Sequence, residues 1–185
     1  FNNRSLPIGY IISLGNQSQL TIEDAINYAL DDNRITAVGI YAESFTNAEK
    51  LIKVFKKSRS KKIPIAIVKV GRSKAASKTI LSHTGSLSGK EDLYDALFQR
   101  MGVARCSTLA ELCEILKLLH TQGILKNDKI SIMGPSGGDM AMIGDVAESQ
   151  SLNFAKIPPK IINDLKKVNH PSVLISNPFD LQTYN

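Results

Sequence analysis

The run IPIAIVKV at residues 63–70 constrains the fold of this chain more than any other stretch, because Lys69 is its only charged residue. An apolar run of strand length without polar alternation is typical of a strand that is covered on both faces. Amphipathic helical patterns precede it at 47–58 and follow it at 91–102. Strands separated by single helices predict a parallel sheet with right-handed crossovers and helices on both faces, which is an α/β fold.

The same alternation extends along the rest of the chain. Short apolar runs predict further strands at 8–13, 36–42, 103–106 and 129–133, and amphipathic patterns predict further helices at 21–32, 108–123, 140–150 and 158–168. The polar stretch LKNDK at 125–129 is a candidate domain boundary. We therefore expect a flavodoxin-like domain at 1–125 and the first part of a second flavodoxin-like domain at 126–185.

Composition narrows the classes of function. Hydrophobic residues make up 43% of the chain and charged residues 22%, as in globular proteins, and no apolar run approaches the ~20 residues of a membrane span. The net charge of +6 owes much to basic residues at 53–62, where they complement the C-terminal dipole of a predicted helix. Aromatic residues are only 6% of the chain and tryptophan is absent, which argues against nucleic-acid binding. Two cysteines without disulfide or zinc spacing indicate reduced thiols and a cytoplasmic protein.

The stretch SHTGSLSG at 82–89 places a histidine in a long polar segment after the predicted strand 63–70. Around His83, Gly85 and several hydroxyl residues have little bulk and many hydrogen-bond donors, so they suit an oxyanion better than a protein core. Composition alone leaves two interpretations of His83 open, a solvated surface histidine and a reactive imidazole. The other two histidines, His120 at a helix end and His170 before a proline, are interpreted as structural.

A reactive His83 would need a carboxylate partner, since an acid held against the second ring nitrogen fixes the tautomer and stabilises the cation. Glu43 is the candidate, because it follows the predicted strand 36–42. The segment that contains His83 also follows a strand, and parallel sheets form their sites outside the carboxyl ends of strands. Both residues are therefore expected at the same edge of the sheet.

The turn GPSGGD at 134–139 lies between a predicted strand and a predicted helix. Backbone amides and the helix dipole can hold an anion there, and Gly137 and Gly138 would let a phosphate come close. The motif matches neither the P-loop nor the dinucleotide fingerprint. A tight structural turn and a phosphate site both remain open at this point.

Several of these stretches together resemble a known family. The residues 71–112, with GRS followed by SHTGSLSG, resemble the histidine loop and following helix of the NDP-forming acyl-CoA synthetases, which are related to succinyl-CoA synthetase. The stretch at 8–17, the strand that ends at Glu43, the turn at 134–139 and SNPFDL at 176–181 occur in the family's order. The resemblance thus covers essentially the whole chain.

The resemblance implies a phosphohistidine enzyme that interconverts acyl-CoA, phosphate and NDP with free acid, CoA and NTP. It assigns the phosphoryl-carrying histidine to His83, the orienting glutamate to Glu43, and a phosphate-cradling helix start to Ser136, Gly137 and Gly138. Gly85 is expected to bind the phosphate as well. CoA and ATP/ADP or GTP/GDP with Mg²⁺ are then substrates of the whole enzyme, and neither a permanent cofactor nor a resident metal is expected.

This sequence also departs from the family pattern. It begins too late to include the first phosphate-cradling helix, and its second domain stops after SNPFDL. The expected partners are a CoA-binding domain, an ATP-grasp domain or subunit, and further copies in an oligomer, so the fragment alone is expected to be inactive. The alternatives are the acyl-CoA-binding or regulatory region of a protein-lysine acetyltransferase and a purely structural docking module. Retention of His83 and Glu43 favours the ligase.

Overall fold

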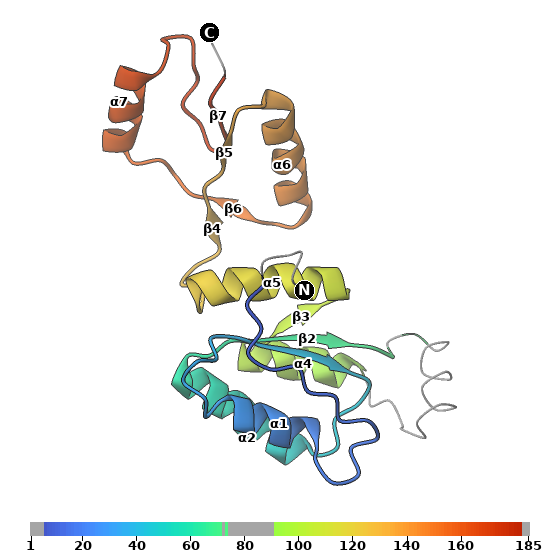
Figure 1. The fold of residues 1–185 in the computed structure, drawn as a ribbon. Helices are drawn as coiled ribbons and strands as arrows, with labels where there is room; N and C mark the ends of the chain where they lie inside the picture. The colour runs from blue at the N-terminus through green and yellow to red at the C-terminus, as the bar shows by residue number, and fades with distance from the viewer. Residues whose placement is uncertain (1–5, 72, 74–90, 183–185) are drawn as a thin grey trace. The chain divides into compact units, whose positions relative to one another are not determined.

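The structure is a computed structural model that describes residues 6–71, 73 and 91–182. The chain forms two compact units, Phe1–Leu125 and Lys126–Asn185, and each is described by itself. Figure 1 shows the first unit as a small sheet with helices on both of its faces.

The sheet of the first unit contains β1 (Val38–Ala42), β2 (Ile65–Lys69) and β3 (Ala104–Cys106), in the order β1-β2-β3. Both pairings are parallel, with Val38 opposite Ile65 and Ala66 opposite Ala104. Every residue of the central strand β2 is buried, as the apolar run predicts. The parallel α/β fold predicted from the sequence is confirmed.

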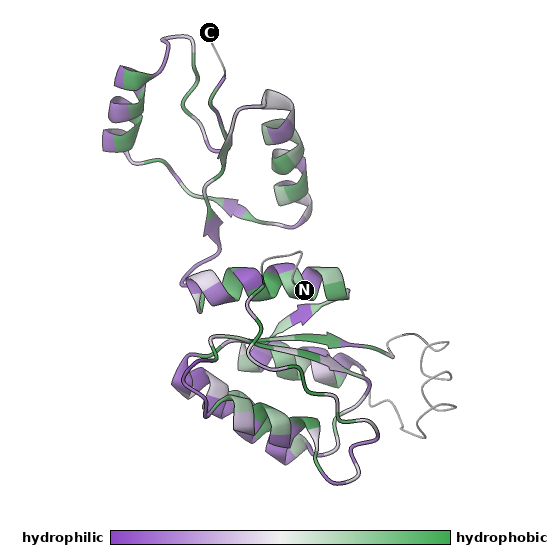
Figure 2. Cartoon of the chain, in the orientation of Figure 1, coloured by the Kyte–Doolittle hydropathy of each residue, from purple (hydrophilic) through white to green (hydrophobic). Residues whose placement is uncertain are grey.

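Among the described residues of the first unit, the helices that cover this sheet are α1 (Ile22–Ala29), α2 (Ala48–Lys61), α4 (Glu91–Met101) and α5 (Leu109–Gln122). One hydrophobic cluster joins side chains of α1, α2 and α4 to β1 and β2, and a second joins α5 to β2 and β3. Figure 2 shows the corresponding alternation of hydrophobic and hydrophilic stripes along the helices. The helix starts follow the sequence, because Thr21, Asn47 and Thr108 each accept a hydrogen bond from a first-turn backbone N–H.

The predicted strand at 8–13 is wrong. These residues adopt no strand, and Ile11 and Ile12 are 75% and 48% exposed. The Tyr10 side chain bonds the turn that follows α1, where its hydroxyl donates to Asp32 and accepts from Arg34 at 2.9 Å. The apolar run therefore crosses the open edge of the sheet instead of pairing with it.

Strand β1 is also less buried than its composition predicts. Its residues alternate between covered and uncovered positions, and Tyr41 is 55% exposed. Within the described residues β1 is an edge strand of the sheet, paired only with β2. An edge strand with one covered face shows this alternation, whereas a central strand such as β2 does not.

The second unit consists of short strands and two helices. Its elements are β4 (Lys129–Ile130), β5 (Met133–Gly134), α6 (Gly137–Ser149), β6 (Asn153–Phe154), α7 (Pro159–Val168) and β7 (Phe179–Asp180). Strand β4 pairs with β6 and β5 with β7, both in parallel. The strand predicted at 129–133 is therefore wrong in extent. The Asn177 side chain accepts from the Ile132 N–H and donates to the carbonyls of Ile130 and Ala155, so it bridges the interruption.

Among the described helices, none has the length and apolar character that crossing a membrane requires.

Candidate functional site at the carboxyl edge of the sheet

The carboxyl ends of β1 and β2 lie side by side at one edge of the sheet. Ala42, the last residue of β1, lies opposite Lys69, the last residue of β2. The pairing extends one step further, since the Val70 N–H donates to the Ala42 carbonyl at 3.0 Å. Glu43 therefore leaves the sheet beside the point from which the chain runs on towards His83.

The segment that follows Glu43 in the sequence is anchored by contacts with α1 and α4. The Glu23 carboxylate, which is 1% exposed, accepts from the Thr46 N–H at 3.1 Å, the Asn47 N–H at 3.2 Å and the Thr46 hydroxyl at 3.3 Å. Phe45 packs into the aromatic cluster of α4, with its ring centroid 5.8 Å from Tyr94 and 6.2 Å from Phe98. These contacts hold the turn that carries Glu43 in one conformation.

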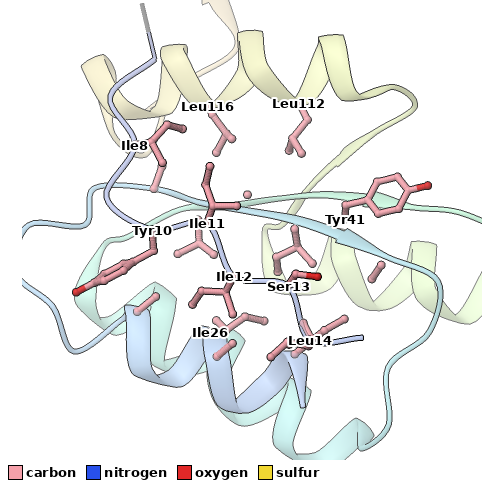
Figure 3. A pocket seen from close by; sticks show the side chains of 18 of the residues that line it. Ile8, Tyr10, Ile11, Ile12, Ser13, Leu14, Ile26, Tyr41, Leu112 and Leu116 are labelled. Carbon is pink, nitrogen blue, oxygen red and sulfur yellow. The ribbon is translucent and has the colours of Figure 1, made fainter. Parts of the chain in front are cut away.

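Glu43 itself is partly exposed and lines a cavity of about 770 Å³. Aliphatic side chains form most of the cavity wall, including Ile8, Ile12 and Leu116 (Figure 3). Among the described residues, none forms a hydrogen bond or ion pair with the Glu43 carboxylate. This carboxylate is thus available at the edge of the sheet to accept a proton or a hydrogen bond.

Two of the predicted site residues, His83 and Gly85, lie outside the described residues, so their geometry with respect to Glu43 stays a prediction.

Ser136, Gly137 and Gly138 form the start of α6 in the second unit. Ser136 is the N-cap, and its Oγ accepts from the Asp139 N–H at 3.2 Å. A Cβ added at Gly137 would lie 2.8 Å from Oδ2 of Asp180, so a larger residue there would require the Asp180 side chain to shift. The glycine turn therefore opens a helix of 13 residues, the local geometry that favours anion binding.

The two remaining histidines each have a hydroxyl partner. His120 Nδ1 lies 2.7 Å from the Thr36 hydroxyl oxygen, and His170 Nδ1 lies 2.8 Å from the hydroxyl of Ser172. Across the part of the chain that the structure describes, no group of three or more His, Cys, Asp or Glu side chains is placed to hold a metal ion.

Sequence reasoning missed a buried charged cluster at the same edge. Lys69 has a fully buried side chain, and its Nζ donates to Glu91 Oε1 at 2.9 Å. Arg105 on β3 donates to the other carboxylate oxygen of Glu91 at 2.6 Å and pairs with Asp95. Burial alone would raise the pKa of Glu91, but the hydrogen bonds from Arg105 and Lys69 outweigh it and lower that pKa.

The fold agrees with the comparison with known protein families. Residues 1–119 match the family model described as the succinyl-CoA ligase like flavodoxin domain. The chain belongs to this family. The resemblance stated from the residues is therefore confirmed, as is the flavodoxin-like α/β fold of the part that carries the histidine segment.

Several relatives of this chain are named as ADP-forming ligases. The chain is 33% identical over 95% of its length to the acetate–CoA ligase [ADP-forming] of Methanocaldococcus jannaschii, and covers 25% of that protein. It is 31% identical over 92% of its length to the alpha subunit of acetate–CoA ligase [ADP-forming] II of Pyrococcus furiosus, and covers 37% of that subunit. The chain thus spans about a quarter to a third of these relatives.

A solved structure supports the fold. The acetyl-coenzyme A synthetase 1 of Ca. Korarchaeum cryptofilum, solved in complex with phosphate and ADP, matches with a TM-score of 0.83 and 24% identity. The match covers 94% of this chain and 38% of that one.

Proposed function

We propose that this chain is part of an NDP-forming acyl-CoA synthetase in which His83 carries the phosphoryl group and Glu43 orients its imidazole. The observation that supports it most is the position of Glu43 at the carboxyl edge, beside the β2 end from which the chain runs to His83. Membership of the succinyl-CoA ligase like family supports the proposal that phosphoryl transfer takes place at this edge.

The proposed reaction has three balanced steps. Phosphate displaces CoA from acyl-CoA, giving acyl phosphate and free CoA. A ring nitrogen of His83 then attacks the phosphorus, and the carboxylic acid leaves as its anion while the phosphoryl group stays on the ring. The β-phosphate oxygen of the NDP finally takes the phosphoryl group to form NTP, which frees the imidazole.

Glu43 acts on the ring rather than on the phosphate. A carboxylate that accepts from the second ring nitrogen holds the attacking nitrogen unprotonated, and it stabilises the positive charge that forms on attack. The anchored turn at 43–47 suits this role, since a carboxylate fixed in place loses less conformational freedom on reaction.

The phosphate is proposed to bind at the start of α6, to Ser136, Gly137 and Gly138, and to Gly85. CoA, the nucleotide and Mg²⁺ are proposed to bind mainly to other domains or subunits, because the chain spans only part of its relatives. Those partners would be a CoA-binding domain and an ATP-grasp domain, in an oligomer located in the cytoplasm. ADP is the nucleotide that the names of the relatives favour.

Labelling of the intact protein tests the proposal. The protein that contains this chain is incubated with γ-labelled ATP and Mg²⁺, and acid-labile, base-stable label is measured. We expect wild type and His120→Asn to take up equal label and His83→Asn to take up none. Label on His83→Asn equal to that of wild type would refute the phosphohistidine.

The orienting role is tested separately. Glu43→Gln should slow labelling about 10–100-fold, because the imidazolium loses its carboxylate, while Glu49→Gln on the exposed first turn of α2 should not. Unchanged labelling kinetics in Glu43→Gln would remove Glu43 from the mechanism. A wild-type protein without any label would favour the regulatory alternative.

A further inference from the structure

Lys69 is a charged residue where the fold would accept an apolar one. It ends a strand in which every residue is buried, and its side chain has no exposure to solvent. Taking an ammonium group out of water is costly unless a counter-charge and hydrogen bonds replace the water. The Lys69 Nζ finds both, in the Glu91 carboxylate at 2.9 Å and the Val70 carbonyl at 2.7 Å, and it lies 5.1 Å from the Tyr94 ring centroid.

Glu91 joins Lys69 to a second strand. It is the first residue of α4, where a negative charge also complements the helix dipole. One carboxylate oxygen accepts from Lys69 on β2 and the other from Arg105 on β3. Arg105 is only 14% exposed and also pairs with Asp95, one turn further along α4. Both strands are thus bonded to the first turns of the same helix.

The place of this cluster in the chain relates it to the histidine-bearing segment. Lys69 is the last residue of β2, and Glu91 is the first residue of α4. The residues between them include His83. The Lys69–Glu91 ion pair therefore fixes the two points at which the histidine-bearing segment leaves and rejoins the described fold.

Stability alone explains this cluster poorly. Replacing a buried ion pair with apolar residues is often neutral or stabilising, so such a pair is weak evidence of a stabilising role. A fixed geometry is a different matter, since a displacement of about 1 Å at a reacting group can cost about 100-fold in rate.

We infer that Lys69, Glu91 and Arg105 are positioning residues that hold the ends of β2 and α4 together, and that phosphoryl transfer to His83, which lies between these ends in the sequence, depends on this link. The inference rests on the proposed function, and it assigns these residues no contact with the substrate. Loss of the clamp should lower the rate of histidine phosphorylation and leave nucleotide binding unchanged.

The test uses the intact protein in three clamp variants: Glu91→Gln, Lys69→Met and the double variant. Each keeps side-chain volume close to that of the native residue. The matched control is Lys50→Met, which breaks the partly exposed Lys50–Asp24 pair at 3.0 Å between α2 and α1. Two quantities are measured: the rate of labelling with its dependence on ATP concentration, and hydrogen exchange at the Val70 amide and the first turn of α4.

We expect both single clamp variants to take up label at least about tenfold more slowly than wild type. The ATP concentration that gives half of the maximal rate should stay within about twofold of the wild-type value. The double variant should be no slower than the slower single variant, because the two residues act as one unit. Exchange should rise at Val70 and in the first turn of α4, and the Lys50→Met control should match wild type in both measurements.

Three outcomes would overturn the inference. Labelling rates within twofold of wild type in both single variants would show that the clamp does not position the histidine. Unchanged exchange at Val70 and α4 would show that the ion pair does not hold these ends, whether or not the enzyme is phosphorylated. Absence of label in wild type, with exchange raised in the variants, would refute the proposed function and the catalytic part of the inference, while the mechanical link would stand.

Discussion

Removal of the Glu23 carboxylate is a demanding test of how the Glu43 turn is held. This buried group accepts from the backbone N–H groups of Thr46 and Asn47 and from the Thr46 hydroxyl, at 3.1–3.3 Å. A buried donor left without its acceptor costs about 1–3 kcal/mol. Thr46 and Asn47 are exposed residues, so water can partly replace the lost acceptor, and Glu23→Ala should lower the free energy of unfolding of the first unit by about 2–3 kcal/mol. Glu23→Gln keeps one acceptor oxygen and should cost about 1–2 kcal/mol.

Urea titration followed by tyrosine fluorescence measures this effect where it arises, since four of the five tyrosines lie within residues 1–125 and tryptophan is absent. Glu49→Gln is the matched control, an exposed carboxylate in the first turn of α2, and should cost less than about 1 kcal/mol. The reasoning fails if Glu23→Ala unfolds within about 1 kcal/mol of wild type with the same dependence on urea.

Three further predictions follow from the first unit. Phe98 is 1% exposed and packs against three other aromatic rings, so Phe98→Ala should lower the free energy of unfolding by about 3–5 kcal/mol. Leu93 is exposed on the same helix, and Leu93→Ala should lower it by less than about 1 kcal/mol in the same titration. The folded-state pKa of Glu91 lies below its ordinary value of 4.5, so the ionised carboxylate contributes fully to stability above pH 4.5 and this contribution is lost as the pH falls through the folded-state pKa. Glu91→Gln should therefore make the free energy of unfolding fall less steeply at acid pH. An unchanged acid limb of the stability–pH curve would contradict this. Burial raises the pKa of the Cys106 thiol, and Cys113 is buried as well, so an aromatic disulfide reagent at pH 8 should modify both far more slowly in native than in urea-unfolded protein; equal rates would show that the thiols are accessible.

Local signals were sufficient for most of the fold. The buried strand β2 follows from an apolar run, and α1 begins at the Thr21–Asp24 capping box visible in the sequence. The run at 8–13 has equally strong apolar character but forms no strand, because strand formation depends on a pairing partner and not on composition. Here the Tyr10 side chain bonds Asp32 and Arg34 in the turn after α1, and the run stays unpaired with β1.

The site was predictable only in part, and for a related reason. Glu43 was found because it follows a strand, and the structure places it at the expected edge. Its catalytic role and that of His83 stay predictions. Lys69, Glu91 and Arg105 were missed, because each has an ordinary local explanation as a strand end, a helix start and a short-strand residue. A charge at the end of a fully buried strand was the available signal, and only the tertiary fold reveals its counter-charge.

The uncovered side of β1 has a consequence for the chain outside its native context. The strand VGIYA carries no charge and no proline, the residues by which natural edge strands resist intermolecular pairing. Within the part of the chain that the structure describes, no strand pairs with the side of β1 opposite β2. Expressed alone at high concentration, the chain is therefore exposed to edge-to-edge association through β1, and solubility during refolding will depend on how well that edge is shielded.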